Sequence, residues 1–167
     1  MTLDDCARVS EIRIGGWRHA YRGLIPRAHL DALSVAEETE RRRAWFARLD
    51  GSVENLVAEE AGRVVGWAAH GPYRDGGQHT ADTELYALYV DPAHLGRGTG
   101  HALLTASVLR RAALGHARMY LWVLEGNTPA RRFYERAGFR PDGTEEPFEV
   151  AGAEVPEVRY ARALGVG

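Results

Sequence analysis

Apolar residues recur along this chain with two periods, one typical of helices and one typical of strands. Behind a polar start at residues 2–5, apolar and small side chains fall at near-helical spacing up to Tyr21, which predicts a first helix. Ser34 and Glu37 have the spacing of a capping box, so a second helix is predicted to begin at Ser34. Three large side chains should lie on its apolar side: Trp45, Phe46 and Leu49.

The middle of the chain has the patterns of strands. Residues 53–60 and 63–70 predict a hairpin with Ala61 at its tip, followed by a glycine. Residues 83–90 predict a further strand. Residues 119–124 are apolar on both alternations, as expected for a buried central strand.

Two more helices and a hairpin complete the predicted elements. A helix over residues 101–114 should stop at Gly115. In a second, shorter helix, Thr128 suits the N-cap and Pro129 the first helical position. The chain then returns through residues 148–161 as a weakly patterned hairpin.

A glycine-rich turn, Leu95 to Gly100, lies between the strand over 83–90 and the next helix. A strand that turns through three glycines into a helix leaves backbone N–H groups free at the positive end of that helix, which suits phosphate. Arg97 adds a charge that can reach the same anion. The turn lacks the Lys-Ser/Thr of a Walker loop and the G-x-G-x-x-G spacing of a dinucleotide loop. A tight turn without a ligand is the alternative.

The turn resembles a known cofactor loop. Its sequence Leu95-Gly96-Arg97-Gly98-Thr99-Gly100 is similar to the acetyl-CoA pyrophosphate loop of the GNAT N-acetyltransferase superfamily, written Gln/Arg-x-x-Gly-x-Gly/Ala. Leu95 departs from the pattern where Gln or Arg is usual. Asn127 and Tyr134 resemble the second signature, in which an Asn opens a helix beside the pantetheine and a Tyr seven residues later faces the thioester sulfur. The two motifs cover residues 84–140.

The resemblance implies the fold. It implies an α/β (α+β) domain whose mixed, mostly antiparallel central sheet splays after its fourth strand, near Val90, and is flanked by about four helices. Family members usually open with a strand before the first helix; none is visible in this sequence, so the sheet is expected to lack it. A length of 167 residues and 45% apolar composition indicate a single domain over residues 1–167.

The resemblance also implies the cofactor site. Acetyl-CoA is expected to bind the glycine turn, the end of the preceding strand and the second signature. These cofactor-binding residues are Leu88, Tyr89, Val90, Leu95, Gly96, Arg97, Gly98, Thr99, Gly100, His101, Asn127, Ala130, Arg131, Phe133 and Tyr134.

On the acceptor side, period two places Glu84 on an otherwise apolar strand face with Tyr86, Leu88 and Val90. A carboxylate there is costly unless it is paired or used. Its position resembles that of the general-base Glu of histone-type family members; an ion pair with an arginine is the alternative. The resemblance implies that the first helix pair forms one wall of the acceptor cleft, and the expected substrate-binding residues are Trp17, Tyr21, Glu84, Tyr86 and Trp122. For Trp17 and Tyr21, a role in packing alone is the alternative.

Glu84 and Tyr134 are the expected catalytic residues. A primary amine with a pKa near ~10 is mostly protonated at neutral pH, so a base such as Glu84, acting through water, is useful. Tyr134 would serve the leaving thiolate; because a phenol pKa of ~10 exceeds a thiol pKa of ~8.5, it would donate a hydrogen bond more readily than a proton. The alternative is that Tyr134 only packs.

Composition and charge limit the kinds of partner and cofactor that are expected. A net charge of −2 gives no reason to expect nucleic acid or an anionic membrane as a partner. The seven histidines do not cluster as metal ligands, so no metal is expected, and the single cysteine, Cys6, fits a reducing cytoplasm. No apolar run approaches the ~20 residues of a membrane span. We expect a cytoplasmic protein; a homodimer is expected from the resemblance only.

The sequence therefore predicts an N-acetyltransferase that moves an acetyl group from acetyl-CoA to a primary amine by direct transfer in a ternary complex. A non-catalytic acyl-CoA-binding module is the alternative; it would keep the glycine turn and lose chemistry at Glu84 or Tyr134, and both residues are present. The acceptor stays open between a small amine, an aminoglycoside-like compound, an amino acid and a peptide or protein amine.

Overall fold

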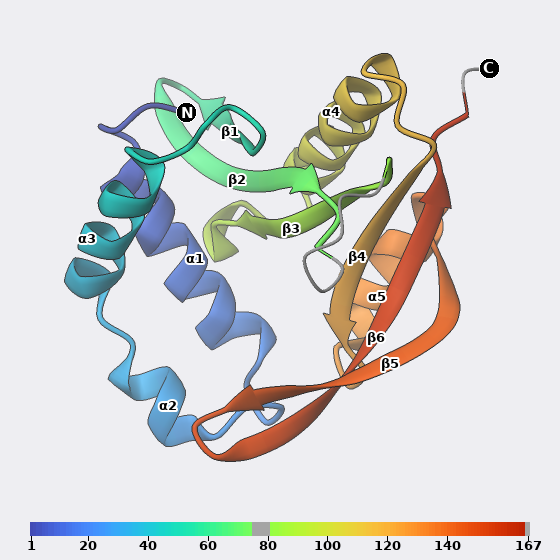
Figure 1. Cartoon of the computed structure of the whole chain (residues 1–167). Helices are drawn as coiled ribbons and strands as arrows, with labels where there is room; N and C mark the ends of the chain where they lie inside the picture. The colour runs from blue at the N-terminus through green and yellow to red at the C-terminus, as the bar shows by residue number, and fades with distance from the viewer. Residues whose placement is uncertain (75–80, 166–167) are drawn as a thin grey trace.

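The computed structural model describes residues 1–74 and 81–165 of the chain (Figure 1). The elements follow in the order α1 (Cys6–Ala20), α2 (Arg27–Ala32), α3 (Val35–Phe46), β1 (Glu54–Glu60), β2 (Arg63–Pro72), β3 (Thr83–Val90), the short 3-10 helix η1 (Pro92–His94), α4 (Thr99–Ala113), β4 (Arg118–Leu124), α5 (Thr128–Arg136), β5 (Arg140–Val150) and β6 (Ala153–Ala163). Within this described part, none of the helices has the length and apolar character needed to cross a membrane.

The strands form one six-stranded sheet in the order β1-β2-β3-β4-β6-β5. Every neighbouring pair is antiparallel except β3 and β4. Alternate residues of β2 point into different cores: Ala68 lies in the cluster that includes α4, whereas Trp67 and Ala69 lie in the cluster that includes α1. Helices therefore cover both faces, and the predicted mixed, mostly antiparallel sheet is confirmed.

The sheet splays between β3 and β4. The two strands pair only at Thr83 with Met119 and at Glu84 with Tyr120, and Figure 1 shows them diverging beyond these residues. The splay thus begins after Glu84, earlier than the predicted place near Val90. In the described residues no strand precedes α1, as predicted, so the strand that ends at the splay is the third, β3.

A β-bulge in β3 corrects the predicted alternation. Ala69 pairs with Ala87 and His70 with Leu85, so Tyr86 is an extra residue on β3. After the bulge the faces exchange: Tyr86, Ala87 and Tyr89 pack toward α1, whereas Leu88 packs into the core of α4 and α5. The prediction that period two holds from Glu84 to Val90 was wrong, because one inserted residue reverses every later side chain.

The second predicted helix is α3, but it buries a polar side. Ser34 caps it as predicted, its hydroxyl accepting a bond from the Glu37 amide at 3.3 Å. The side chains it buries are Glu38, Thr39 and Arg42, whereas Trp45 is 37% exposed. The apolar-side prediction was wrong because paired charges, rather than apolar contacts, hold this helix against α1. The sequence reading also missed α2.

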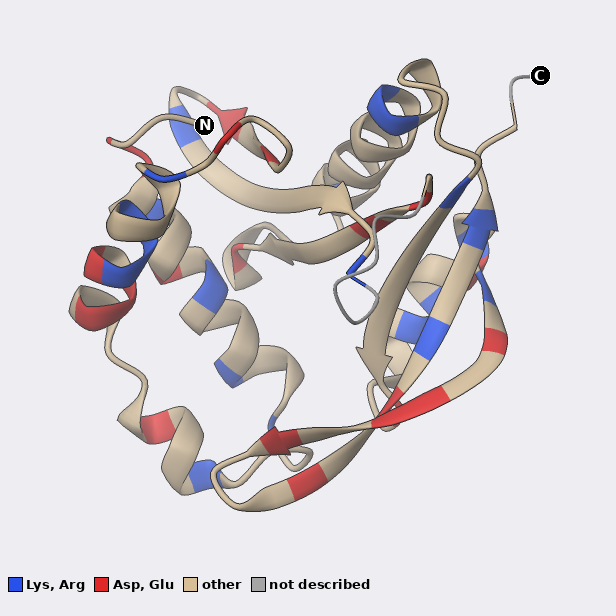
Figure 2. Cartoon of the chain, viewed as in Figure 1, with Lys and Arg blue, Asp and Glu red and all other residues tan. Residues whose placement is uncertain are grey.

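The C-terminal hairpin is much longer than predicted. The strands β5 and β6 pair along most of their length, and β6 also pairs with β4, so this hairpin extends the sheet on the far side of the splay. Figure 2 shows several acidic positions along it. Its inner face reaches the region where β3 and β4 diverge, which places β5 and β6 residues at the site described next.

Candidate active site

A cavity of about 730 Å³ occupies the place where β3 and β4 separate. Residues from α1, β3, β4, α5, β5 and β6 line it. It brings together the following side chains predicted for the site: Trp17, Tyr21, Glu84, Tyr86, Leu88, Tyr89, Val90, Leu95, Trp122, Asn127, Ala130, Phe133 and Tyr134. The glycine turn from Gly96 to His101 adjoins Leu95 and does not line the cavity itself.

The glycine turn has the conformation that its sequence predicts. Gly96 and Gly98 have φ of 77° and 87°, values that disfavour any residue with a Cβ. The first intrahelical bond of α4 runs from the Ala102 amide to the Gly98 carbonyl at 2.9 Å, and Gly98 provides no side-chain cap. The N–H groups of the first helical turn, from Thr99 onward, therefore point outward from a helix N-terminus.

Arg97 lies beside these amides on the surface. Its side chain is 58% exposed, and Nη1 lies 3.6 Å from Glu60 Oε1. An exposed pair of this kind is weak and easily exchanged for another anion. Leu95 is 47% exposed and offers no polar group, so the turn acts through its backbone and Arg97.

The open edge of β3 supplies further amides. The Asp91 amide donates to the Val65 carbonyl on β2 at 2.8 Å. Because amide directions alternate along a strand, the Tyr89 amide also points to β2, and the amides of Leu88 and Val90 point to the splayed side. Of the three residues predicted here, Leu88 and Val90 thus turn their amides to the cavity, whereas Tyr89 contributes its side chain.

Asn127 begins the second signature as the N-cap of α5. Its Oδ1 accepts a bond from the Ala130 amide at 3.3 Å, and the residue is only 7% exposed. The prediction of Thr128 as the cap was wrong by one residue. Arg131, also predicted for the cofactor, does not line the cavity: its guanidinium donates to the Tyr160 hydroxyl and the Glu125 carbonyl, both at 3.0 Å.

Tyr134 lies on α5 with its ring packed against Phe133 and Phe139, at centroid distances of 5.1 and 6.0 Å. Within residues 1–74 and 81–165 its hydroxyl has no hydrogen-bond partner. Burial, with a smaller contribution from Tyr89, raises the pKa of Tyr134 above its ordinary value. The phenol is therefore neutral and free to donate a hydrogen bond into the cavity.

The opposite wall is aromatic and comes from α1. The Trp17 indole N–H donates to the Tyr89 hydroxyl at 2.8 Å, and the Tyr21 and Tyr89 hydroxyls lie 3.3 Å apart. Burial and the neighbouring Tyr89 raise the pKa of Tyr21. Gly16 permits this contact, because a Cβ there would come within 2.7 Å of the Tyr89 ring. Both predicted residues of α1 are thus fixed against β3.

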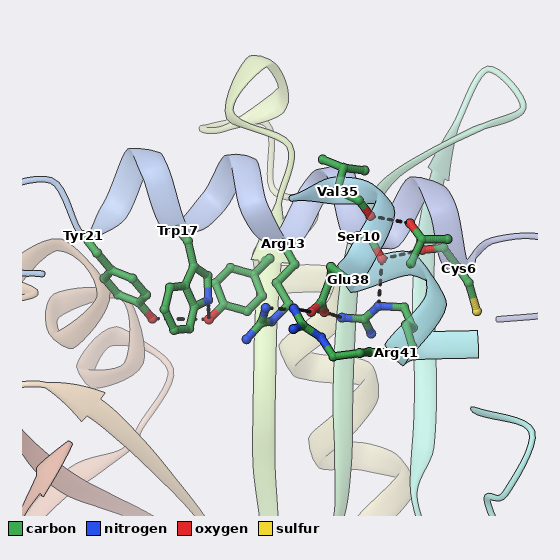
Figure 3. A network of polar contacts seen from close by, with 11 residues as sticks. Cys6, Ser10, Arg13, Trp17, Tyr21, Val35, Glu38 and Arg41 are labelled. Atoms are coloured by element: carbon green, nitrogen blue, oxygen red, sulfur yellow. Dashed lines mark hydrogen bonds and ion pairs between the residues drawn. The ribbon is translucent and has the colours of Figure 1, made fainter. Parts of the chain in front are cut away.

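A polar network behind this wall connects it to α3 (Figure 3). Glu38 is the centre: its Oε1 lies 2.9 Å from Arg42 and 3.4 Å from Arg13. The Arg13 guanidinium carbon lies 4.8 Å from the Trp17 ring centroid, and that of Arg42 lies 4.1 Å from the Trp67 ring centroid. The ion pairs therefore hold the helices that carry the aromatic wall.

Glu84 is buried, with 2% exposure, and is ion-paired. Arg74 binds both of its oxygens: Nη2 lies 2.5 Å from Oε1, and Nε and the backbone amide lie 3.3 and 3.2 Å from Oε2. The Arg74 guanidinium also stacks on the ring of Tyr86, with its central carbon 4.2 Å from the ring centroid. This is the arrangement of the ion-pair alternative, and it occupies the carboxylate that a general base would need.

Several cavity residues were missed by the sequence reading. They are Arg13 on α1, Arg74 after β2, Phe148 on β5 and Glu157 on β6. The hairpin pattern was too weak to assign faces to β5 and β6, and Arg74 follows a strand end without a motif. Their only signal was an isolated charge or aromatic in a predicted strand or loop, which is too common to single out.

Comparisons with a family model, with curated relatives and with solved structures agree with one another. The model of the acetyltransferase (GNAT) family matches residues 18–139. An uncharacterized N-acetyltransferase of Bacillus subtilis, YuaI, is 32% identical over 93% of this chain and 86% of its own length. The L-amino acid N-acyltransferase MnaT of Escherichia coli is 31% identical over 92% of this chain and 79% of its own. The structure of yncA, a putative acetyltransferase from Salmonella typhimurium with its cofactor acetyl-CoA, superposes with a TM-score of 0.77 at 25% identity, covering 100% of this chain and 92% of that one.

Proposed function

The chain belongs to the acetyltransferase (GNAT) family and is an acetyl-CoA-dependent N-acetyltransferase, and from this premise we propose that it transfers the acetyl group directly to a primary amine bound in the same cavity. Family membership favours this enzyme over a non-catalytic acyl-CoA-binding module. The free Tyr134 hydroxyl in a cavity shared by both walls is the observation that carries the proposal. The identity of the amine is the subject of the experiments below.

We propose that backbone groups hold acetyl-CoA. The amides of Thr99, Gly100 and His101 suit the pyrophosphate, because free N–H groups and the helix dipole both favour an anion at that end of α4. Arg97 can exchange its exposed pair with Glu60 for a phosphate. The fit is supported by a turn whose two positive-φ glycines leave the backbone uncovered.

The reaction needs hydrogen-bond donors at two atoms, the carbonyl oxygen that becomes negative and the leaving sulfur. The amides of Leu88 and Val90 on the open edge of β3 are proposed to donate to the pantetheine and to the oxygen that becomes negative in the transition state. Tyr134 is proposed to donate a hydrogen bond to the leaving sulfur. Because burial raises its pKa, Tyr134 stays a neutral donor and does not act as a base.

The proposed steps balance as follows. The ammonium group of the acceptor loses one proton, and the neutral nitrogen attacks the thioester carbonyl carbon. The C–N bond forms and the C–S bond breaks. The second proton of the nitrogen passes to the thiolate, while the Tyr134 hydroxyl donates a hydrogen bond to the sulfur. The products are an acetamide, CoA thiol and one proton released to solvent.

Glu84 has two candidate roles. Its position supports the role of general base, and its three bonds from Arg74 support an anchoring role in which it holds Arg74 at the cavity. Both oxygens of this carboxylate are already engaged by Arg74 and are not free to meet the acceptor. We therefore propose the anchoring role as the resting state, and Glu84→Gln separates the two roles: loss of kcat with unchanged KM for the amine supports the base.

The proposal is tested with Tyr134→Phe. Calorimetry should find acetyl-CoA binding within about threefold of wild type, because the hydroxyl has no ground-state partner. Amine-dependent release of CoA thiol should fall by about a hundredfold in kcat, in the range observed when one positioned hydrogen-bond donor is removed. An amine panel that spans small amines, amino acids and peptides identifies the best acceptor.

Tyr120→Phe is the matched control. Tyr120 is a buried tyrosine on β4 that does not line the cavity, so its variant should keep wild-type kcat. Equal losses in both variants would mean that general destabilisation explains the result. Full activity in Tyr134→Phe would refute the role of the hydroxyl, and acetyl-CoA binding without transfer to any amine would refute the proposed reaction.

A further inference from the structure

Among the described residues, two carboxylates line the cavity, and only Glu84 is ion-paired. Glu84 is bound by Arg74, as described above. Glu157 on β6 also lines the cavity, and in residues 1–74 and 81–165 its carboxylate has no ion pair or hydrogen bond. Among the described residues, the fold therefore gives this carboxylate no direct partner.

Glu157 lies on the acceptor face of the sheet. Its neighbours in sequence on β6, Val158 and Tyr160, belong to the core under α5. Alternation places Glu157 and Arg159 on the opposite face, and the Arg159 guanidinium carbon lies 5.8 Å from the Trp122 ring centroid there. Glu157 pairs in register with Leu124 at the end of β4. It therefore approaches the cavity from the side opposite Tyr134.

The surroundings of Glu157 are poor in compensating charge. Glu146 faces it from β5 and Glu84 from β3, and both are acidic; the charge of Arg74 lowers the pKa of Glu157, but Arg74 is itself bound to Glu84. Tyr21, the residue that follows α1, also interacts electrostatically with Glu157. Burial, then Glu146 and Glu84, raise the pKa of Glu157. Figure 2 shows this acidic character along the β5–β6 hairpin.

A half-buried carboxylate without a cation is costly, and an ammonium group bound beside it would relieve that cost. The other walls of this half of the cavity are aromatic or apolar: Trp17, Tyr21, Trp122 and Phe148. Aromatic faces also attract ammonium groups and accept apolar bodies. The carboxylate and the aromatic walls thus complement one kind of molecule, an ammonium group carried on an apolar body.

Building on the proposed function, we propose that Glu157 is the counter-ion that binds the ammonium group of the acceptor, and that the acceptor carries this group on an apolar or aromatic body. Glu157 is then a substrate-binding residue that selects cationic acceptors over neutral ones of the same shape. Glu84, already neutralised, does not share this role.

The test compares two probes of similar shape on the CoA-saturated protein. Calorimetry measures binding of 2-phenylethylamine, which is cationic at pH 7, and of neutral 2-phenylethanol. Wild type should bind the amine at least about tenfold more tightly, as expected for a partly desolvated charge pair. Glu157→Gln, which keeps the shape of the side chain, should remove this preference and leave acetyl-CoA binding unchanged.

Glu146→Gln is the matched control, because it removes the same charge from the paired position on β5. It should keep the preference within about threefold. Wild type without a preference for the amine would overturn the inference. So would a preference that survives in Glu157→Gln, or an equal loss in Glu146→Gln, which would assign the effect to the general acidity of the hairpin.

Kinetics separate this inference from the proposed function. If amines are acetylated, Glu157→Gln should raise KM for the amine by at least about tenfold with a smaller change in kcat. An unchanged KM would overturn the inference while acetyl transfer stands. A Glu157-dependent preference for the ammonium without thiol release from any amine would support the inference and refute the proposed reaction.

Discussion

The two halves of the cavity are built in different ways. The half assigned to the cofactor uses two short continuous stretches, residues 95–101 and 127–134, and offers mostly backbone groups. The half assigned to the acceptor uses side chains that come from α1, β3 and the β5–β6 hairpin and are far apart in sequence, as Tyr21, Glu84 and Glu157 are. One half is local and the other is assembled by the tertiary fold.

This difference has a physical consequence. Backbone amides at a helix start keep their direction as long as the helix forms, and they tolerate many side chains. Side chains on separate elements keep their geometry only while the packing between those elements holds. Changes that loosen the packing should therefore affect the acceptor half first, and changes in turn conformation should affect the cofactor half.

The largest expected effect comes from breaking the polar network of Figure 3, and it should distinguish the two halves of the cavity. Glu38→Gln removes the charge that pairs with buried Arg42 and with Arg13. Leaving a buried guanidinium without its partner should lower the free energy of unfolding by about 4 kcal/mol. Urea denaturation measures this loss.

In the protein that remains folded, KM for the amine should rise because Arg13 supports Trp17. The dissociation constant of acetyl-CoA should stay unchanged. Glu37→Gln is the control, since this exposed neighbour on α3 has no ion pair among the described residues and should cost well under 1 kcal/mol. A loss of acetyl-CoA affinity equal to the loss for the amine would contradict the separation of the halves.

The second effect concerns the cofactor half alone. Gly98→Val places a β-branched residue at φ of 87°, so the turn must change conformation and the amides of α4 lose their arrangement. Acetyl-CoA affinity should fall by about a hundredfold, or about 3 kcal/mol. Gly143→Val is the matched control: Gly143 has the same φ and equally open space, but it lies on β5. Equal losses in both variants would contradict a specific cradle.

The success of the sequence-based predictions also differs between the local half and the half assembled by the tertiary fold. The glycine turn and the Asn127–Tyr134 helix were predicted because glycine, proline and asparagine act locally, and the N-cap was misplaced by only one residue. The bulge at Tyr86 was not predicted, since nothing in an alternating strand marks an inserted residue. Glu157 and Arg74 could not be predicted, because only the folded sheet brings them to the cavity.

The buried side of α3 shows another limit. Glu38 and Arg42 have the i, i+4 spacing of an ordinary surface pair, and nothing in the sequence distinguishes a solvated pair from this buried one. Large apolar residues drew the prediction to Trp45 instead. Periodicity therefore predicted where α3 lies in the sequence and failed to predict which side it buries.

The third expected effect concerns a buried histidine of β2 beside the β3 bulge. His70 lies in β2 opposite the β3 bulge; it is fully buried, and its Nε2 is 3.8 Å from Glu54 Oε1, beyond hydrogen-bond distance. Burial, and then the charge of Arg111, lower its pKa to about 4. The unfolded chain, with a pKa near 6.5, binds this proton first, so the free energy of unfolding is greatest above pH 6.5 and falls as the pH drops toward 4.

From pH 7 to pH 5 this histidine should lower the free energy of unfolding by about 2 kcal/mol. Urea denaturation at the two pH values measures the change. His70→Asn should remove most of it, whereas substitution of the partly exposed His116 after α4, in His116→Asn, should not. An identical pH dependence in wild type and His70→Asn would contradict the assignment.

The smallest expected effect comes from removing a single hydrogen bond in the acceptor half. Trp17→Phe keeps a ring against Phe148 and Tyr21 but removes the indole N–H that donates to the Tyr89 hydroxyl at 2.8 Å. One such bond contributes about 1 kcal/mol, so KM for the amine should rise about fivefold with acetyl-CoA affinity unchanged. Trp45→Phe on the exposed side of α3 should change neither. An unchanged KM in Trp17→Phe would mean that aromatic packing alone positions the wall and that its polar bonds only accompany it.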